Sequence, residues 1–147
     1  MLFRSEAVLR AQAPRSDHRA RLFALLHDAP EYVIGDMISP FKAVMGGDYK
    51  AVETRLQRAI HLRFSLPPEI SETLRKKIKQ ADQIAAYFEA TELAGFSVSE
   101  ATEFFGRPRG FSSSAFELAP SAVVAAQDAF LRRFHAIEAE RRRTSAA

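Results

Sequence analysis

The chain has 147 residues, of which 47% are hydrophobic and 27% charged, with 6 Gly and 7 Pro. Such a chain can bury one core without cross-links, which excludes intrinsic disorder and fibrous or repeat architectures. The 21 Lys and Arg against 18 Asp and Glu give a net charge of only +3. Because the basic residues are scattered apart from three arginines at 141–143, we do not expect nucleic acid as a partner.

The sequence contains no cysteine, which excludes disulfides, thiolate metal sites and cysteine nucleophiles. Any metal site must therefore use histidine and carboxylate ligands. The unbroken apolar runs, such as 22–26 and 122–126, are far shorter than the roughly 20 residues that a membrane helix needs. The first ten residues also lack the pattern of a signal peptide. We therefore expect a cytoplasmic protein without a membrane partner.

Apolar residues recur at a spacing typical of helices, and no alternating stretch is paired with a hairpin turn. This pattern predicts an all-α fold, a single-domain helical bundle of about six helices over residues 1–147. The chain begins inside a helical pattern, 2–12, with no cap before it, so we expect an incomplete first helix. A proline ends this pattern, and Ser16 or Asp17 can cap the short helix that follows. Residues 29–47 are expected to form a loop with short helical turns.

Four further helices are expected in the rest of the chain, separated by glycine and proline signals. They are a helix from about 49 to 64, a long helix from 71 to about 93, a short helix opened by the capping box of Ser97 and Glu100, and a last helix from about 120. On the last helix, the residues expected to face inward are Val123, Phe130, Phe134 and Ile137. Residues 106–114 are expected to form a loop, and residues 140–147 a frayed tail.

Polar residues occupy two places where the helical pattern requires apolar ones. His27 continues a core-facing stripe, and Asp28 follows it about 100° further around the helix. Asp82 lies on the predicted buried face of the long helix, between Ile78 and Ala85. Because a buried, unpaired carboxylate costs several kcal/mol, Asp82 requires a partner.

One partner that would satisfy all three residues is a divalent metal ion, because imidazole and carboxylate ligands suit zinc, manganese, cobalt and related ions. An ordinary role also stays open at this point. An acid on an apolar face more often caps a helix or pairs with an arginine than binds a metal.

Two stretches of the sequence resemble a known family. Residues 25–42, Leu-Leu-His-Asp-Ala-Pro-Glu-Tyr-Val-Ile-Gly-Asp-Met-Ile-Ser-Pro-Phe-Lys, resemble the HD-domain metal-dependent phosphohydrolases, in particular the branch that contains bacterial 5′-deoxynucleotidases. Residues 79–82, Lys-Gln-Ala-Asp, followed by Ala-Ala-Tyr at 85–87, resemble the distal Asp motif of that branch. The two stretches cover about a fifth of the chain, and their order and separation fit the family.

The resemblance implies a phosphohydrolase that releases phosphate from nucleoside 5′-monophosphates through a metal-activated water. It implies one divalent ion (Mn, Co, Zn, Ni or Mg) bound by His27, Asp28 and Asp82. It further implies that Glu31 handles protons around the attacking water. The substrate contacts implied are Asp36 and Ser39 on the sugar and Lys42 on the phosphate.

The sequence departs from the family in two respects. A first His ligand belongs on the helix before the His-Asp pair, at a position that falls at or before Met1 here. We therefore expect the chain to be truncated at its N-terminus relative to the family. His18 lies on the opposite face of the helix from His27, and we expect His61 and His135 on the surface, so none of the three replaces this ligand. The upstream Arg-Trp that grips phosphate in the deoxynucleotidases is also missing, because the chain has no Trp.

Two other functions stay open. The first is an HD-fold module that binds a nucleotide or regulates a partner without turnover, which the missing ligand favours. The second is a basic helical bundle associated with nucleic acid, which the arginines at 141–143 favour weakly. Within the enzyme class, guanosine tetraphosphate hydrolases and cyclic-nucleotide phosphodiesterases share the His-Asp pair. A homodimer also stays open.

Overall fold

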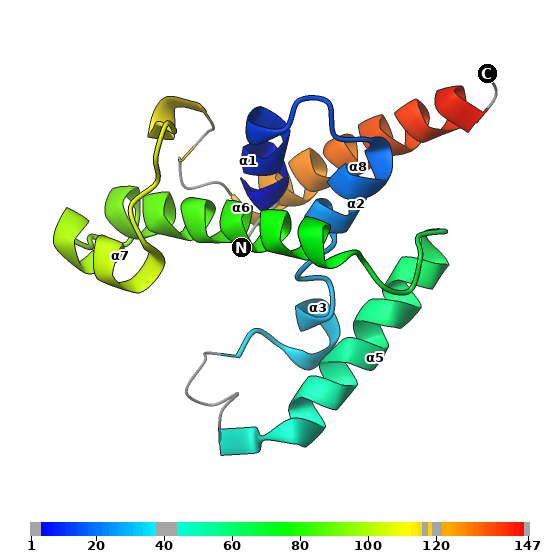
Figure 1. Cartoon of the computed structure of the whole chain (residues 1–147), viewed down its shortest axis with the longest axis horizontal. Coiled ribbons are helices and arrows are strands. Elements are labelled where there is room, and N and C mark those ends of the chain that lie inside the picture. The colour runs from blue at the N-terminus through cyan, green and yellow to red at the C-terminus, as the bar shows by residue number, and fades with distance from the viewer. Residues whose placement is uncertain (1–3, 38–43, 116–117, 119–121, 146–147) are drawn as a thin grey trace. The chain divides into compact units, whose positions relative to one another are not determined.

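A computed structural model describes residues 4–37, 44–115, 118 and 122–145 of the chain. These residues form seven α-helices and one short 3₁₀ helix, and no strand occurs among them (Figure 1). The predicted all-α fold is therefore confirmed. Two compact units make up the chain, Met1–Leu25 with Glu72–Ala147, and Leu26–Ser71.

The first unit contains five α-helices and the 3₁₀ helix. They are α1 (Arg4–Gln12), α2 (His18–Leu25), α6 (Glu72–Glu92), α7 (Val98–Phe105), η1 (Ser113–Ala115) and α8 (Val123–Ser145). Helix α1 packs against α6 and α2, α7 packs against α6, and α2 packs against α8. The two N-terminal helices thus connect the long helices α6 and α8.

Local sequence signals explain several helix ends in this unit. The Asp17 carboxylate accepts a 2.8 Å hydrogen bond from the backbone N–H of Ala20, so Asp17 rather than Ser16 caps α2. The Ser16 hydroxyl instead donates to the carbonyl of Ala13 at 2.7 Å. Helix α7 starts at the predicted capping box, in which Ser97 and Glu100 bond to each other's backbone N–H groups.

The core of the first unit is apolar and is supplied mainly by α1, α2 and α6. Its buried hydrophobic residues are Val8, Leu9, Leu22, Phe23, Ala24, Leu25, Ile78, Ala81, Ile84, Ala85, Tyr87, Phe88, Ala90, Ala101 and Ile137. The inward prediction for Val123 is wrong, because 73% of this residue is exposed. Val123 shares a helix face with Ile137, but the first turn of α8 is exposed, and the neighbouring Val124 is 67% exposed as well.

Helix α8 continues through the segment that was expected to fray. It extends to Ser145, and the Arg141 guanidinium forms an ion pair with Glu138 at 2.9 Å. The carboxylate of Glu140 forms an ion pair with the guanidinium of Arg21 at 3.0 Å. This pair connects the last part of α8 to α2.

Helix α1 buries polar side chains as well as apolar ones. Glu6 is fully buried and receives two hydrogen bonds from the guanidinium of Arg133 on α8, at 2.8 and 2.5 Å. Two residues earlier, on the other side of the helix, Arg4 bonds to Glu89 of α6 at 2.8 Å. The two ion pairs fasten α1 to both long helices. The pair with Arg133 also gives the buried carboxylate of Glu6 the positive partner that it requires away from water.

The second unit contains α3 (Glu31–Ile34) and α5 (Gly47–Arg63). The predicted loop at 29–47 thus contains a short helix in its described part. After α5 the chain reverses at Ser65, whose φ is 56°, and the backbone N–H of Leu66 bonds to the carbonyl of His61 at 2.8 Å. The buried residues of this unit are Leu26, Pro30, Tyr49, His61 and Leu66.

None of the helices described is long and apolar enough to cross a membrane.

The Glu6–Arg133 pair leads to a stability prediction. Replacing Arg133 with Met leaves a fully buried carboxylate without its countercharge, so we expect the free energy of unfolding to fall by about 3–5 kcal/mol. The matched control is Arg132→Met, which removes an exposed arginine from the same helix and is expected to cost less than about 0.5 kcal/mol. Urea unfolding followed by circular dichroism measures both. Equal losses in the two variants would contradict the prediction.

Candidate metal centre

The predicted His-Asp pair lies in the turn that directly follows α2. The backbone N–H of Ala29 bonds to the carbonyl of Leu26 at 3.1 Å, and the N–H of Glu31 bonds to the carbonyl of Asp28 at 3.0 Å. These bonds close the turn around His27 and Asp28. The Nδ1 atom of His27 lies 2.9 Å from a carboxylate oxygen of Asp28.

The predicted acid Asp82 is half-buried on α6, with Ala81 and Ala85 of the same helix fully buried beside it. Its Oδ1 atom accepts a hydrogen bond from the hydroxyl of Ser5 on α1 at 3.5 Å, a length at which such a bond is weak. Its Oδ2 atom lies 3.2 Å from the ammonium of Lys79, one turn earlier on α6. A hydroxyl and an exposed lysine are thus among the partners of this acid.

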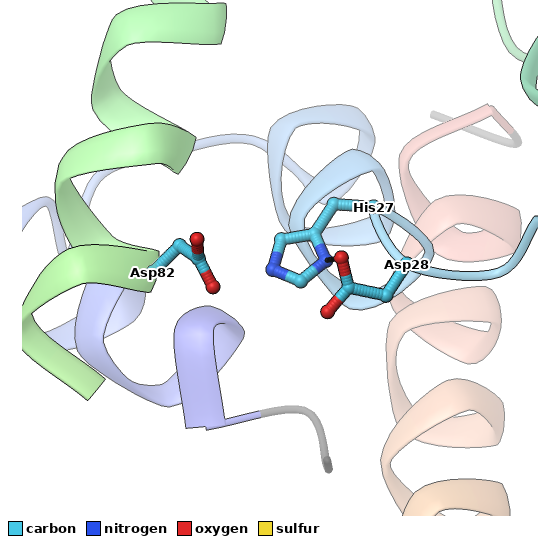
Figure 2. A group of neighbouring side chains, drawn as sticks. All are labelled: His27, Asp28 and Asp82. Carbon is cyan, nitrogen blue, oxygen red and sulfur yellow. Dashed lines mark ion pairs between the residues drawn. The ribbon is translucent and has the colours of Figure 1, made fainter. Parts of the chain in front are cut away.

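His27, Asp28 and Asp82 form a group of neighbouring side chains (Figure 2). One ligand atom from each, an imidazole nitrogen and two carboxylate oxygens, lies within 4.8 Å of the other two. Ligand atoms around one tetrahedral zinc ion lie about 3.4 Å apart, because the bonds are about 2.1 Å long. The limit of 4.8 Å is wider than this spacing, and it identifies the three residues as a group that could hold a metal ion.

The charges of this group also fit a divalent cation. A neutral imidazole and two carboxylates together carry a charge of −2, which one divalent ion balances. Lys79 is 67% exposed, so solvent screens its pairing with Asp82. The donor set, the spacing and the charge therefore agree with a site for an ion such as zinc, manganese or cobalt.

The other predicted site residues do not belong to this group of ligand atoms or lie outside the described residues. Glu31 is the first residue of α3 and is half-buried. Asp36 is exposed and follows Gly35, whose φ of 80° ends α3 in a conformation that favours glycine. Neither acid belongs to the group of metal-ligand atoms. Ser39 and Lys42, predicted for substrate binding, lie outside the described residues.

His61 corrects a sequence interpretation. We expected it on the surface of its helix, but it is only 5% exposed. Its Nδ1 atom lies 3.0 Å from the carbonyl oxygen of Pro68, and its Nε2 atom lies 2.7 Å from the amide nitrogen of Gln57. The chain reverses after α5 and brings the segment 66–68 back over the histidine, which a helical pattern alone does not reveal. Two signals were available, the Pro-Pro pair after the helix and a glutamine four residues before the histidine.

The comparisons with known proteins agree with the predicted family. The family model described as 5′-deoxynucleotidase YfbR-like matches residues 6–104. The chain belongs to this YfbR-like family. It is thereby a member of the HD-domain superfamily, as the two sequence stretches predicted. The matched region contains His27, Asp28 and Asp82 and the helices that carry or adjoin them.

The YfbR-like chain also resembles an uncharacterized protein of Rhodobacter capsulatus. The two are 46% identical over 129 residues, which is 84% of this chain and 63% of the relative. The chain therefore spans about 63% of the length of the curated relative that it matches.

Burial of His61 leads to a prediction on pH dependence. Removal from water lowers the pKa of His61 below its ordinary value of 6.5, partly offset by the bond to the Pro68 carbonyl. The unfolded chain therefore takes up this proton more readily than the folded chain does. The contribution of neutral His61 to stability is present above pH 6.5 and is lost as the pH falls through the lowered pKa.

We therefore expect the free energy of unfolding to be lower at about pH 5.5 than at about pH 7.5, and His61→Gln to reduce this difference. Urea titrations with a chelator present separate the effect from metal binding. The matched control is His135→Gln, which changes an exposed histidine and is expected to keep the wild-type pH dependence. An unaltered pH dependence in His61→Gln would show that this histidine is not its source.

Proposed function

We propose that this protein is a metal-dependent phosphohydrolase that releases phosphate from nucleoside 5′-monophosphates. The observation that supports the proposal best is the convergence of ligand atoms from His27, Asp28 and Asp82 within 4.8 Å. Membership of the YfbR-like 5′-deoxynucleotidase family supports the substrate class.

The proposed metal ligands are His27, Asp28 and Asp82, with Mn, Co, Zn, Ni or Mg as candidate ions. A divalent ion, when bound, lowers the pKa of water towards neutrality and polarises a phosphoryl oxygen. The hydroxyl of Ser5 and the ammonium of Lys79 bond to the two oxygens of Asp82, so they orient this carboxylate. Within the pair, Nδ1 of His27 lies 2.9 Å from a carboxylate oxygen of Asp28, and we propose the other ring nitrogen, Nε2, as the ligand nitrogen.

The proposed role of Glu31 is proton transfer. As water attacks phosphorus, Glu31 takes a proton from it and passes a proton to the 5′-oxygen. A new P–O bond to the water oxygen forms while the bond between phosphorus and the 5′-oxygen breaks, so the products are a nucleoside and phosphate. No covalent bond to the protein is needed. The position of Glu31 four residues after His27, at the start of α3, keeps it in the segment that carries the His-Asp pair.

The proposed substrate contacts lie in the segment that follows α3. Asp36 is exposed directly after the turn at Gly35, so its carboxylate is accessible to the hydroxyls of a sugar. Ser39 is proposed to contact the sugar as well, and Lys42 the phosphate.

The first test is metal-dependent release of phosphate. Purified protein with each candidate ion is incubated with ribo- and deoxyribonucleoside 5′-monophosphates, and free phosphate is measured. We expect turnover that dialysis against a chelator abolishes, and that Asp82→Asn lowers more than about 100-fold, because loss of a ligand should exceed the effect of losing a residue that only supports one. Asp128→Asn, an exposed acid on α8, is the matched control and is expected to keep full activity.

Turnover that survives both the chelator and Asp82→Asn would contradict the proposal. Nucleotide binding in calorimetry without turnover under any ion would favour the alternative of a binding or regulatory module.

The second test concerns the proton. Replacing Glu31 with Gln keeps the shape of the side chain but removes its proton-accepting charge, so we expect kcat to fall by about 10²–10⁴-fold. The affinity for Mn²⁺, measured by calorimetry, is expected to be unchanged because Glu31 is not a proposed ligand. A variant with wild-type kcat would exclude Glu31 from the proton transfer.

A further inference from the structure

Gln57 of α5 connects the predicted His-Asp turn to the buried histidine of the same unit. Its side-chain nitrogen Nε2 lies 3.2 Å from the carbonyl oxygen of Leu26 and 2.7 Å from Nε2 of His61. Gln57 is half-buried, while Leu26 and His61 are buried. The network therefore lies largely out of water, where its hydrogen bonds are stronger than at the surface.

The direction of each hydrogen bond follows from the chemistry of the partners. The carbonyl of Pro68 can only accept, so Nδ1 of His61 must carry the hydrogen of the neutral ring. Nε2 of His61 then has a lone pair and accepts from the amide of Gln57. The carbonyl of Leu26 also accepts only, so it takes the second amide hydrogen. Both hydrogens of the Gln57 amide are thereby assigned, and His61 fixes which way the amide faces.

The bond to Leu26 acts on the segment that carries the proposed ligands. Leu26 immediately precedes His27 and Asp28, and its carbonyl also accepts from the backbone N–H of Ala29 at 3.1 Å. The Leu26 carbonyl thus accepts two hydrogen bonds, one from Ala29 within the turn and one from the Gln57 side chain on α5. Rotation of the peptide between Leu26 and His27 would break both bonds and would move the base of the His27 side chain.

We propose that Gln57 is a positioning residue for the metal ligands His27 and Asp28, oriented by the neutral imidazole of His61. The proposal rests on the proposed metal site. It assigns to α5 a role in metal affinity that acts through the hydrogen bond from Gln57 to the carbonyl of Leu26. Residues that orient metal ligands through hydrogen bonds change metal affinity by about 10–100-fold when they are replaced.

The test is titration with Co²⁺, followed by its visible absorption bands, which report both affinity and ligand geometry. Gln57→Met keeps the length of the side chain and removes both donors, so we expect Co²⁺ affinity to fall by about tenfold and the absorption bands to change shape. Arg58→Met is the matched control. It removes an exposed residue next to Gln57, whose ion pair with Glu69 also connects α5 to the following turn, and is expected to leave affinity and spectrum unchanged.

A second variant keeps the proposal testable if Gln57→Met does not fold. His61→Phe removes the acceptor that orients the Gln57 amide, and we expect a smaller loss of Co²⁺ affinity in the same direction. Circular dichroism establishes which variants are folded. Wild-type affinity and spectrum in a folded Gln57→Met or His61→Phe protein would overturn the proposal, as would an equal loss in Arg58→Met.

His27→Ala separates this proposal from the proposed function. If the wild type binds Co²⁺, His27→Ala abolishes binding and Gln57→Met has no effect, the metal site stands and the role of Gln57 is wrong. If the wild type binds no Co²⁺, both are wrong.

Discussion

The structure depends on how its buried and half-buried carboxylates are paired with positively charged groups. Glu6 is fully buried, and each of its two carboxylate oxygens accepts a hydrogen bond from Arg133. These bonds also hold α1 against α8. Asp82 is half-buried, and its two oxygens contact the hydroxyl of Ser5 and the ammonium of Lys79. The physical basis for proposing a divalent cation at this point is that ligand atoms of Asp82, Asp28 and His27 lie within 4.8 Å of one another.

The two acids are connected through α1. Two adjacent residues of this helix make the contacts. Ser5 bonds to Asp82 on α6, and Glu6 bonds to Arg133 on α8. The ion pair that fastens α1 thus also sets the position of the hydroxyl that orients the proposed ligand. A helix of nine residues is marginal on its own, so its buried contacts rather than its intrinsic propensity keep it in place.

Much of the fold followed from the sequence because the signals are local. Helical periodicity, the capping box at Ser97 and the cap at Asp17 depend on residues within a few positions of each other, so they keep their meaning before any tertiary contact forms. The apolar stripe of α6 and the acid within it were visible for the same reason. The exposed Val123 and the buried His61 were misplaced because periodicity tells which residues share a face and not whether that face is covered.

The sequence by itself determined the all-α class, the family and the identity of the residues at the candidate site, because helix periodicity and short motifs are written in neighbouring positions. Only the tertiary structure decided which groups surround them. Ser5 lies 77 residues from Asp82 in the chain, and Gln57 lies 31 residues from Leu26. Such pairings depend on how helices pack, and that depends on the summed burial of many side chains rather than on any local pattern.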